Sequence, residues 1–154
     1  DREADFHWLI KVSQLARVFI SLKSKPENYV DNIDDAKKKL IAVILGSAAH
    51  KELLSNGFSE QENLYIVSNN EQITNLFVTG RVDLVYDDPN NVSNYLANNG
   101  EADVALNFKK ITKENQRVSY IALNKNTDQT IVSRLQQAAQ KFEKTAQYQY
   151  LLAN

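Results

Sequence analysis

Residues 40–58, LIAVILGSAAHKELLSNGF, contain the signals that decide the fold of this chain. The first six residues are a short apolar run rich in β-branched side chains, which predicts a fully buried strand over 40–45. Gly46 permits a tight turn. Ser47 is a good N-cap for the helix that follows, and Gly57 predicts its end. A buried strand that leads directly into a helix is the first half of a βαβ unit.

The alternation of strand and helix continues along the chain. Apolar runs predict further strands over 6–12, 16–22, 63–67, 82–86, 102–106 and 118–123. Helices are predicted after Asn32, after Ser68 with Glu71 at capping-box spacing, from Pro89, and over 127–144 with an apolar stripe of Ile131, Leu135, Ala138 and Phe142. Strands separated by helices indicate an α/β fold with a mainly parallel sheet flanked by helices.

Composition and charge exclude several classes of function. The 154 residues are 43% hydrophobic and 24% charged, as in a typical soluble globular protein. No apolar run approaches the roughly 20 residues of a membrane span. The net charge is −1 without a basic block, so we expect no nucleic-acid partner. The absence of cysteine excludes disulfides and cysteine-ligated metal, and we expect neither a metal nor a cofactor.

The turn at Gly46 is the first candidate binding site. In open α/β sheets, ligands bind beyond the carboxyl ends of the strands, near helix N-termini. Gly46 permits close approach of the backbone, and the free N–H groups of Ser47, Ala48 and Ala49 would face a bound anion. The more common alternative is that Ser47 only caps its own helix. Ser47 and His50 lack the G-x-S-x-G turn, so we predict no hydrolase triad.

The acidic pair Asp87 and Asp88 is the second candidate site, at the end of the predicted strand 82–86. Asp88 precedes Pro89, so its simplest role is to cap the next helix. Asp87 can equally be a solvated surface acid. No histidine or third carboxylate lies nearby in the sequence, so the pair does not predict a metal site.

These segments, in this order, resemble the bacterial extracellular solute-binding proteins of family 3, which serve amino-acid ABC transporters. Residues 33–58 resemble the family segment "lddLkGkkiavq.Gs..e.yl...g", and residues 63–88 resemble "v.sneqal..L..GrvDav..d". Residues 118–152 are similar to the family's C-terminal segment, and the GRVD block at 80–83 is the most specific part. The chain departs from the family at Lys39, in the sequence TAQYQY, and in a spacing after Asp88 that is one residue shorter.

The resemblance implies the type II periplasmic binding fold, in which two crossing strands join two lobes that hold the ligand between them. It assigns residues 1–22 to a remnant of lobe I and the first hinge strand. Residues 23–117 correspond to lobe II, and residues 118–154 to the second hinge strand and the C-terminal helices of lobe I. We expect the early part of lobe I to be missing from this chain.

The resemblance also implies a function and the residues that serve it. It implies a periplasmic protein, not an enzyme, that captures a small polar solute such as an amino acid for the permease of an ABC importer. By position, Asp88 meets the ligand's ammonium, with Asp87 as the alternative because of the shortened spacing. Ser47 and Ala48, beside Gly46, meet its carboxylate.

Two other functions occur on the same fold and stay open. One is an enzyme similar to the cyclohexadienyl dehydratases, with Asp87, Asp88 and His50 as its candidate acids and bases. The other is the extracytoplasmic sensor domain of a signalling protein. We expect the 154 residues alone to bind amino acids weakly or not at all, and to be capable of forming a dimer.

Overall fold

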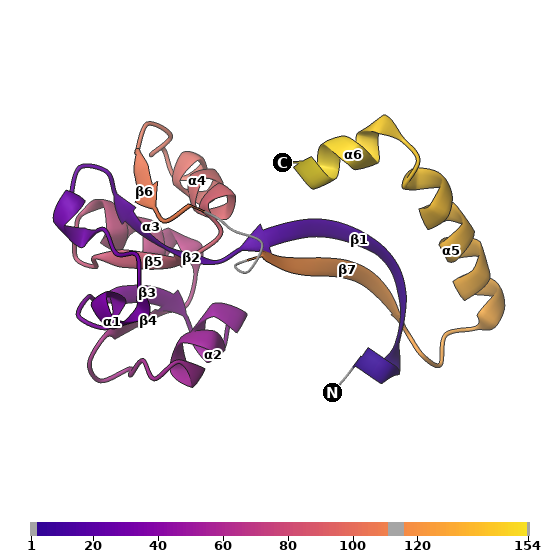
Figure 1. Cartoon of the computed structure of the whole chain (residues 1–154), viewed down its shortest axis with the longest axis horizontal. Helices are drawn as coiled ribbons and strands as arrows, with labels where there is room; N and C mark the ends of the chain where they lie inside the picture. The colour runs from indigo at the N-terminus through magenta and orange to yellow at the C-terminus, as the bar shows by residue number, and fades with distance from the viewer. Residues whose placement is uncertain (1–2, 111–115, 154) are drawn as a thin grey trace. The chain divides into compact units, whose positions relative to one another are not determined.

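The computed structural model of the protein describes residues 3–110 and 116–153 (Figure 1). The chain divides into two compact units, one formed by Ala16–Asn115 and the other by Asp1–Leu15 together with Gln116–Asn154. The divisions expected from the resemblance, at 22/23 and 117/118, lie about seven and about two residues further along the chain. The assignment of the units to lobes stays a prediction.

The larger unit contains a five-stranded sheet with the strand order β4-β3-β5-β2-β6. Its strands are β2 (Val18–Leu22), β3 (Ile41–Ile44), β4 (Leu64–Val67), β5 (Leu84–Asp87) and β6 (Leu106–Phe108). β3 runs parallel to β4 and to β5, whereas β2 runs antiparallel to both of its neighbours. Because β2 is the reversed strand and the other four share a direction, the predicted α/β class with a mainly parallel sheet is confirmed.

Helices cover both faces of this sheet (Figure 1). They are α1 (Ile33–Ala36), α2 (Ala48–Ser55), α3 (Asn70–Val78) and α4 (Pro89–Asn98), with a short 3-10 turn η2 (Pro26–Asn28). The core on the α3 and α4 side includes Phe77, Val85 and Val92, and the core on the other side includes Leu53 and Leu84. Adjacent residues of β5 therefore enter opposite cores, which explains why a central strand reads as a continuous apolar run.

Two details of the larger unit differ from the expectation. Asn69, not Ser68, caps α3: its Oδ1 accepts the N–H of Gln72 at 2.9 Å, while Ser68 Oγ contacts the Gln72 side chain. The predicted strand 102–106 is also displaced, because β6 begins only at Leu106. The register explains this, since Leu106 pairs with Leu22, the last residue of β2.

The smaller unit is a two-stranded sheet of β1 (Phe6–Ala16) and β7 (Gln116–Asn124), followed by α5 (Gln129–Phe142) and α6 (Ala146–Ala153), with a 3-10 turn η1 (Glu3–Asp5) at its start. Its core cluster contains Ile10, Ala139 and Tyr148. The predicted apolar stripe of α5 is exposed: Ile131, Leu135 and Phe142 are 50%, 40% and 40% accessible, and Ala138 is also exposed. The helix instead buries the adjacent stripe, with Val132 and Ala139.

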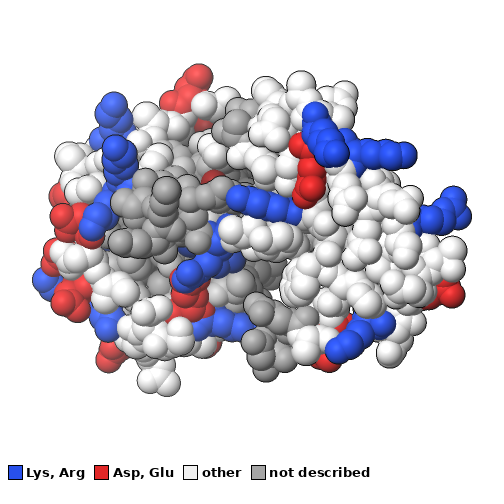
Figure 2. Space-filling view, turned by 45° about the vertical axis from the view of Figure 1, so that its right-hand side comes forward, with Lys and Arg blue, Asp and Glu red and all other residues white. Residues whose placement is uncertain are grey.

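The charged side chains of the surface and the length of the helices bear on which partners are expected. On the face drawn in Figure 2, basic and acidic side chains are interspersed rather than gathered by sign. The absence of a nucleic-acid partner stays a prediction. Within the part of the chain that the structure describes, no helix is both long and apolar enough to cross a bilayer.

Candidate functional site

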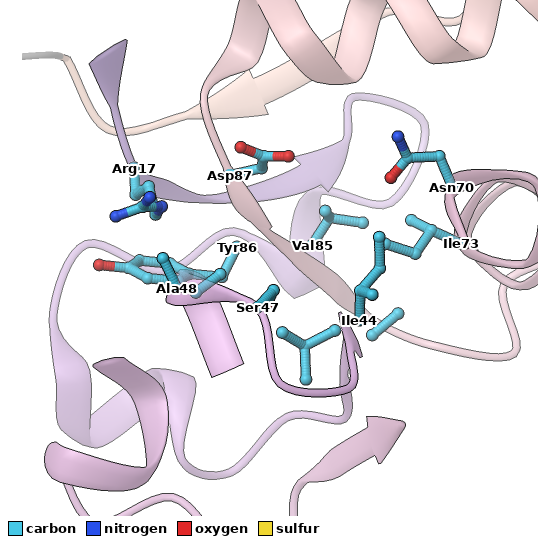
Figure 3. Close-up of a pocket in the computed structure, with 12 residues that line it drawn as sticks. Arg17, Ile44, Ser47, Ala48, Asn70, Ile73, Val85, Tyr86 and Asp87 are labelled. Carbon is cyan, nitrogen blue, oxygen red and sulfur yellow. The ribbon is translucent and has the colours of Figure 1, made fainter. Parts of the chain in front are cut away.

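A pocket of about 140 Å³ lies in the larger unit, at the carboxyl ends of β3 and β5 (Figure 3). The ends of both strands, the first turn of α2, the start of α3 and Arg17 line it. Because β3 and β5 are parallel neighbours, their carboxyl ends and the helices that follow them lie at one edge of the sheet. This is the position at which open α/β sheets bind ligands.

The turn between β3 and α2 forms one wall of the pocket. Gly46 has a φ of +69°, and a Cβ there would meet no atom within 4 Å, so glycine is favoured by backbone conformation and not by space. The Gly46 N–H donates to His50 Nδ1 at 3.1 Å, and Ser47 Oγ accepts the N–H of His50 at 3.1 Å. Ser47 therefore both caps α2 and lines the pocket.

The backbone donors of this turn differ in availability. The N–H of Ser47 donates to the carbonyl of Ile44 at 3.1 Å, so the expected anion contact from this group is already taken within the protein. Ala48 and Ala49 are the first residues of α2 and line the pocket. Their N–H groups are among those that have no partner within a helix. A bound anion would therefore meet Ala48 and Ala49 together with the Ser47 hydroxyl.

The cap provided by Ser47 can be measured. We expect Ser47→Ala to lower the free energy of unfolding by about 1 kcal/mol, because the N–H of His50 loses its acceptor. Urea denaturation followed by circular dichroism measures the change. Ser68→Ala is the matched control, since Ser68 also precedes a helix but does not cap it. Equal losses in the two variants would contradict the assignment of Ser47 as a cap.

Asp88 is buried and its carboxylate is fully engaged by the backbone. The residue is 3% exposed. Oδ1 accepts the N–H of Asn90 at 2.9 Å, and Oδ2 accepts the N–H of Ala16 at 2.7 Å. The register of β2 against β5 pairs Val18 with Asp87, which brings Ala16 close to Asp88. Asp88 therefore caps α4, as its position before Pro89 predicts, and also binds residue 16.

Asp87 lines the pocket. Its Oδ1 accepts the N–H of Asp88 at 2.7 Å and, at 3.4 Å, the side-chain amide of Asn91. Burial raises the pKa of the Asp87 carboxyl, and the hydrogen bonds from Asp88 and Asn91 and the charge of Arg17 offset part of this effect. A carboxylate that has lost hydration in this way is stabilised by a cation brought next to it.

Arg17, a residue that the sequence did not indicate, lines the same pocket as Asp87. Arg17 Nη1 is 3.1 Å from Glu52 Oε2, and the Tyr86 hydroxyl donates to Glu52 Oε1 at 3.1 Å. Arg17 and Tyr86 line the pocket, as does Asn70 across from Asp87 (Figure 3). No local motif links Arg17 with Glu52, which lies 35 residues away. The sheet order β3-β5-β2, with α2 following β3, brings them together.

Neither histidine lines the pocket. His50 is buried, with Nε2 3.0 Å from Glu60 Oε1. His7 lies in the smaller unit, where its Nε2 is 3.0 Å from the carbonyl oxygen of Lys125. Among residues 3–110 and 116–153, no group of three or more His, Asp or Glu side chains is placed to hold a metal ion.

The described residues form a mainly parallel α/β sheet with a pocket at the carboxyl ends of β3 and β5. No family model and no curated protein matches the sequence. Solved structures with the same fold include an ancestral arginine-binding protein bound to arginine, with a TM-score of 0.69 and 18% identity over 97% of this chain and 64% of that chain. The chain has the type II periplasmic binding protein fold, as the resemblance predicted.

Two further structures share this fold. A histidine kinase sensor domain with similarity to periplasmic binding proteins has a TM-score of 0.73 and 15% identity, over 97% of this chain and 62% of that chain. The GluR0 ligand-binding core from Nostoc punctiforme, in complex with glutamate, has a TM-score of 0.70 and 20% identity, over 97% and 65%. The chain thus spans less than two thirds of the length of these proteins.

Proposed function

We propose that the protein binds a small solute that carries both an ammonium and a carboxylate group, namely an α-amino acid. The observation that supports this is that the N-terminus of α2 and the Asp87 carboxylate line one pocket. The ligand's carboxylate would accept hydrogen bonds from Ala48, Ala49 and the Ser47 hydroxyl. Its ammonium would donate to Asp87.

The energetics of such contacts favour binding. A hydrogen bond to a charged group contributes about 1.5–3 kcal/mol, and a helix N-terminus contributes about 0.3–2 kcal/mol to an anion beside it. Asp87, not Asp88, is the proposed partner of the ammonium, because both oxygens of Asp88 already accept backbone N–H groups. Arg17 is a cation at the same pocket, and its pairing with Glu52 limits its pull on Asp87.

At the level of the whole protein, we propose an extracytoplasmic, periplasmic binding protein that delivers its solute to the permease of an ABC importer and performs no chemistry. The fold shared with amino-acid-binding proteins supports this role. The second candidate is a sensor domain, which the likeness to a histidine kinase sensor domain favours. A transmembrane helix and kinase encoded in the same gene would select the sensor, and a neighbouring permease gene would select the importer.

The proposed ligand class can be tested by calorimetry on the full-length protein. The probes are the individual L-amino acids and, for the tightest of them, its amine without the carboxylate and its acid without the ammonium. We expect heat on titration of the amino acid and a large loss of affinity for both analogues, because each lacks one of the two charged contacts. Absence of binding by every amino acid, or equal binding of either analogue, would contradict the proposal.

A further inference from the structure

Asp87 and Asn70 also line a second hollow, of about 380 Å³, which extends along α4. The other lining residues are Asn91, Asn94, Tyr95 and Asn98. Their spacing places them on one face of the helix. The described residues that line this hollow are therefore four asparagines, one aspartate and one tyrosine, without an aliphatic or a cationic side chain.

Tyr95 is the least expected member of this set. It is 7% exposed, and its hydroxyl is buried without a hydrogen-bond partner among the described residues. A phenylalanine would fill the same volume without leaving a buried polar atom unsatisfied, and such atoms are rare in proteins. Asn94 and Asn98 lie on the same helix face and are exposed, and each amide offers both a donor and an acceptor. Asn94 and Asn98 thus offer neutral hydrogen-bonding groups to the hollow, and the buried hydroxyl of Tyr95, on the same helix, has no partner among the described residues.

The two hollows differ in size. Ordinary small-molecule sites occupy about 300–1,000 Å³. The pocket at α2, with about 140 Å³, is smaller than this range, whereas the hollow along α4, with about 380 Å³, lies within it. Asp87 and Asn70 are common to both, so a ligand held at Asp87 could extend from one into the other.

We propose that the hollow along α4 is a second subsite, which receives the side chain of the bound amino acid and selects a neutral side chain with both donors and acceptors, such as a carboxamide. This inference rests on the proposed function, because it takes the ammonium and carboxylate to be held in the first pocket. An amide side chain pairs with the asparagines as donor and acceptor at once. An apolar side chain would cover the asparagine amides without forming hydrogen bonds to them, and would leave the Tyr95 hydroxyl without a partner. Polar sites reject apolar analogues because polar groups are left unpaired in this way.

Charged side chains are disfavoured for different reasons. An anionic side chain would approach the Asp87 carboxylate, which repels it. A cationic side chain would find Asp87 already paired with the ligand's own ammonium. The lining therefore favours glutamine over norleucine, glutamate and lysine.

The test is calorimetry on the full-length protein with glutamine and norleucine, which share the α-amino acid head and differ in the side chain. We expect glutamine to bind at least tenfold more tightly. The double variant Asn94→Ala/Asn98→Ala should reduce this preference to about twofold by weakening glutamine alone. Both residues are exposed, so the core stays intact. Asn75→Ala, an exposed asparagine of α3 outside the hollow, should change neither affinity.

Tyr95→Phe separates a ligand contact from a structural role. We expect it to weaken glutamine but not norleucine, with no fall in melting temperature. Equal affinities for the two probes in the wild type, or variants that change neither, would overturn the subsite and leave the amino-acid site standing. Absence of binding by both probes and by every other amino acid would overturn the proposed function together with the subsite.

Discussion

Asp88→Ala is expected to lower the free energy of unfolding by about 2–4 kcal/mol, since it removes a helix cap and also leaves a buried backbone N–H without its acceptor. The cap is the bond from the N–H of Asn90 to Oδ1, and the second bond comes from the N–H of Ala16 to Oδ2 at 2.7 Å. The alanine side chain can replace neither acceptor.

The size of this effect is measured by urea denaturation against Asn69→Ala. Asn69 caps α3 with a single bond to the N–H of Gln72, so its removal should cost about 1 kcal/mol. If the two variants lose the same stability, the bond to Ala16 contributes nothing. Asp88→Asn keeps one acceptor and should fall between them. If Asp88→Ala instead weakened amino-acid binding at unchanged stability, Asp88 would be the ammonium ligand, as the family resemblance implies.

Asp87→Asn is expected to reduce the affinity of the full-length protein for an α-amino acid at least tenfold, about 1.4 kcal/mol. Asparagine keeps the oxygen that accepts the N–H of Asp88 but lacks the charge that would meet the ammonium. Asp103→Asn is the matched control, because Asp103 is an exposed acid that does not line this pocket. Unchanged affinity in Asp87→Asn would exclude Asp87 as the ammonium partner.

Asp87→Asn should weaken ligand binding but should not lower the free energy of unfolding. Burial raises the pKa of Asp87 in the folded state above its ordinary value. Between the unfolded and the folded pKa, the folded state binds more protons than the unfolded state, so stability falls as the pH rises through this window. Asp87→Asn removes this cost, and at neutral pH its stability should equal or exceed that of the wild type.

Ligand binding follows the ionised carboxylate. As the pH falls through the raised pKa of Asp87, the carboxyl becomes neutral and loses its attraction for the ammonium. We therefore expect calorimetry to show affinity falling on acidification, at a pH above that of an ordinary aspartate. In Asp87→Asn this pH dependence should disappear. Its persistence would place the responsible group elsewhere.

The fold could be predicted from the sequence because its signals are local. A buried β-branched run, a glycine at positive φ and a capping Ser47 follow each other within a few residues at 40–58. The reversed direction of β2 could not be predicted, because strand direction depends on which neighbours a strand pairs with, and β2 pairs with β5 and β6, far along the chain.

The sequence predicted that the candidate site lies at the end of a strand, but not which of the two aspartates there lines the pocket. The sequence places Asp87 and Asp88 side by side, but only the Ala16 N–H, 72 residues away, distinguishes the engaged carboxylate from the one at the pocket. The choice of N-cap residue for α3 could not be predicted from the sequence either. Ser68 and Asn69 are both good N-caps, and the helix begins after the second because Asn69 reaches the N–H of Gln72.

Periodicity alone also misplaced the buried face of α5. Ile131 and Leu135 have helical spacing, yet the structure buries Val132 and Ala139 on the neighbouring stripe. Both stripes are apolar enough to be buried. The choice depends on what lies against the helix, and in the described part of the smaller unit this is a core of Ile10 and Tyr148.

The division of the chain also has a consequence for the order of folding. The larger unit is one continuous stretch, whereas β1 and β7 come from opposite sides of it. Closing a flexible loop of about 100 residues costs about 4 kcal/mol in chain entropy before any strand contact forms. Once Ala16–Asn115 has folded, that flexible loop no longer exists. We therefore expect β1 to pair with β7 late in folding, at a rate that depends on how quickly the continuous sheet assembles.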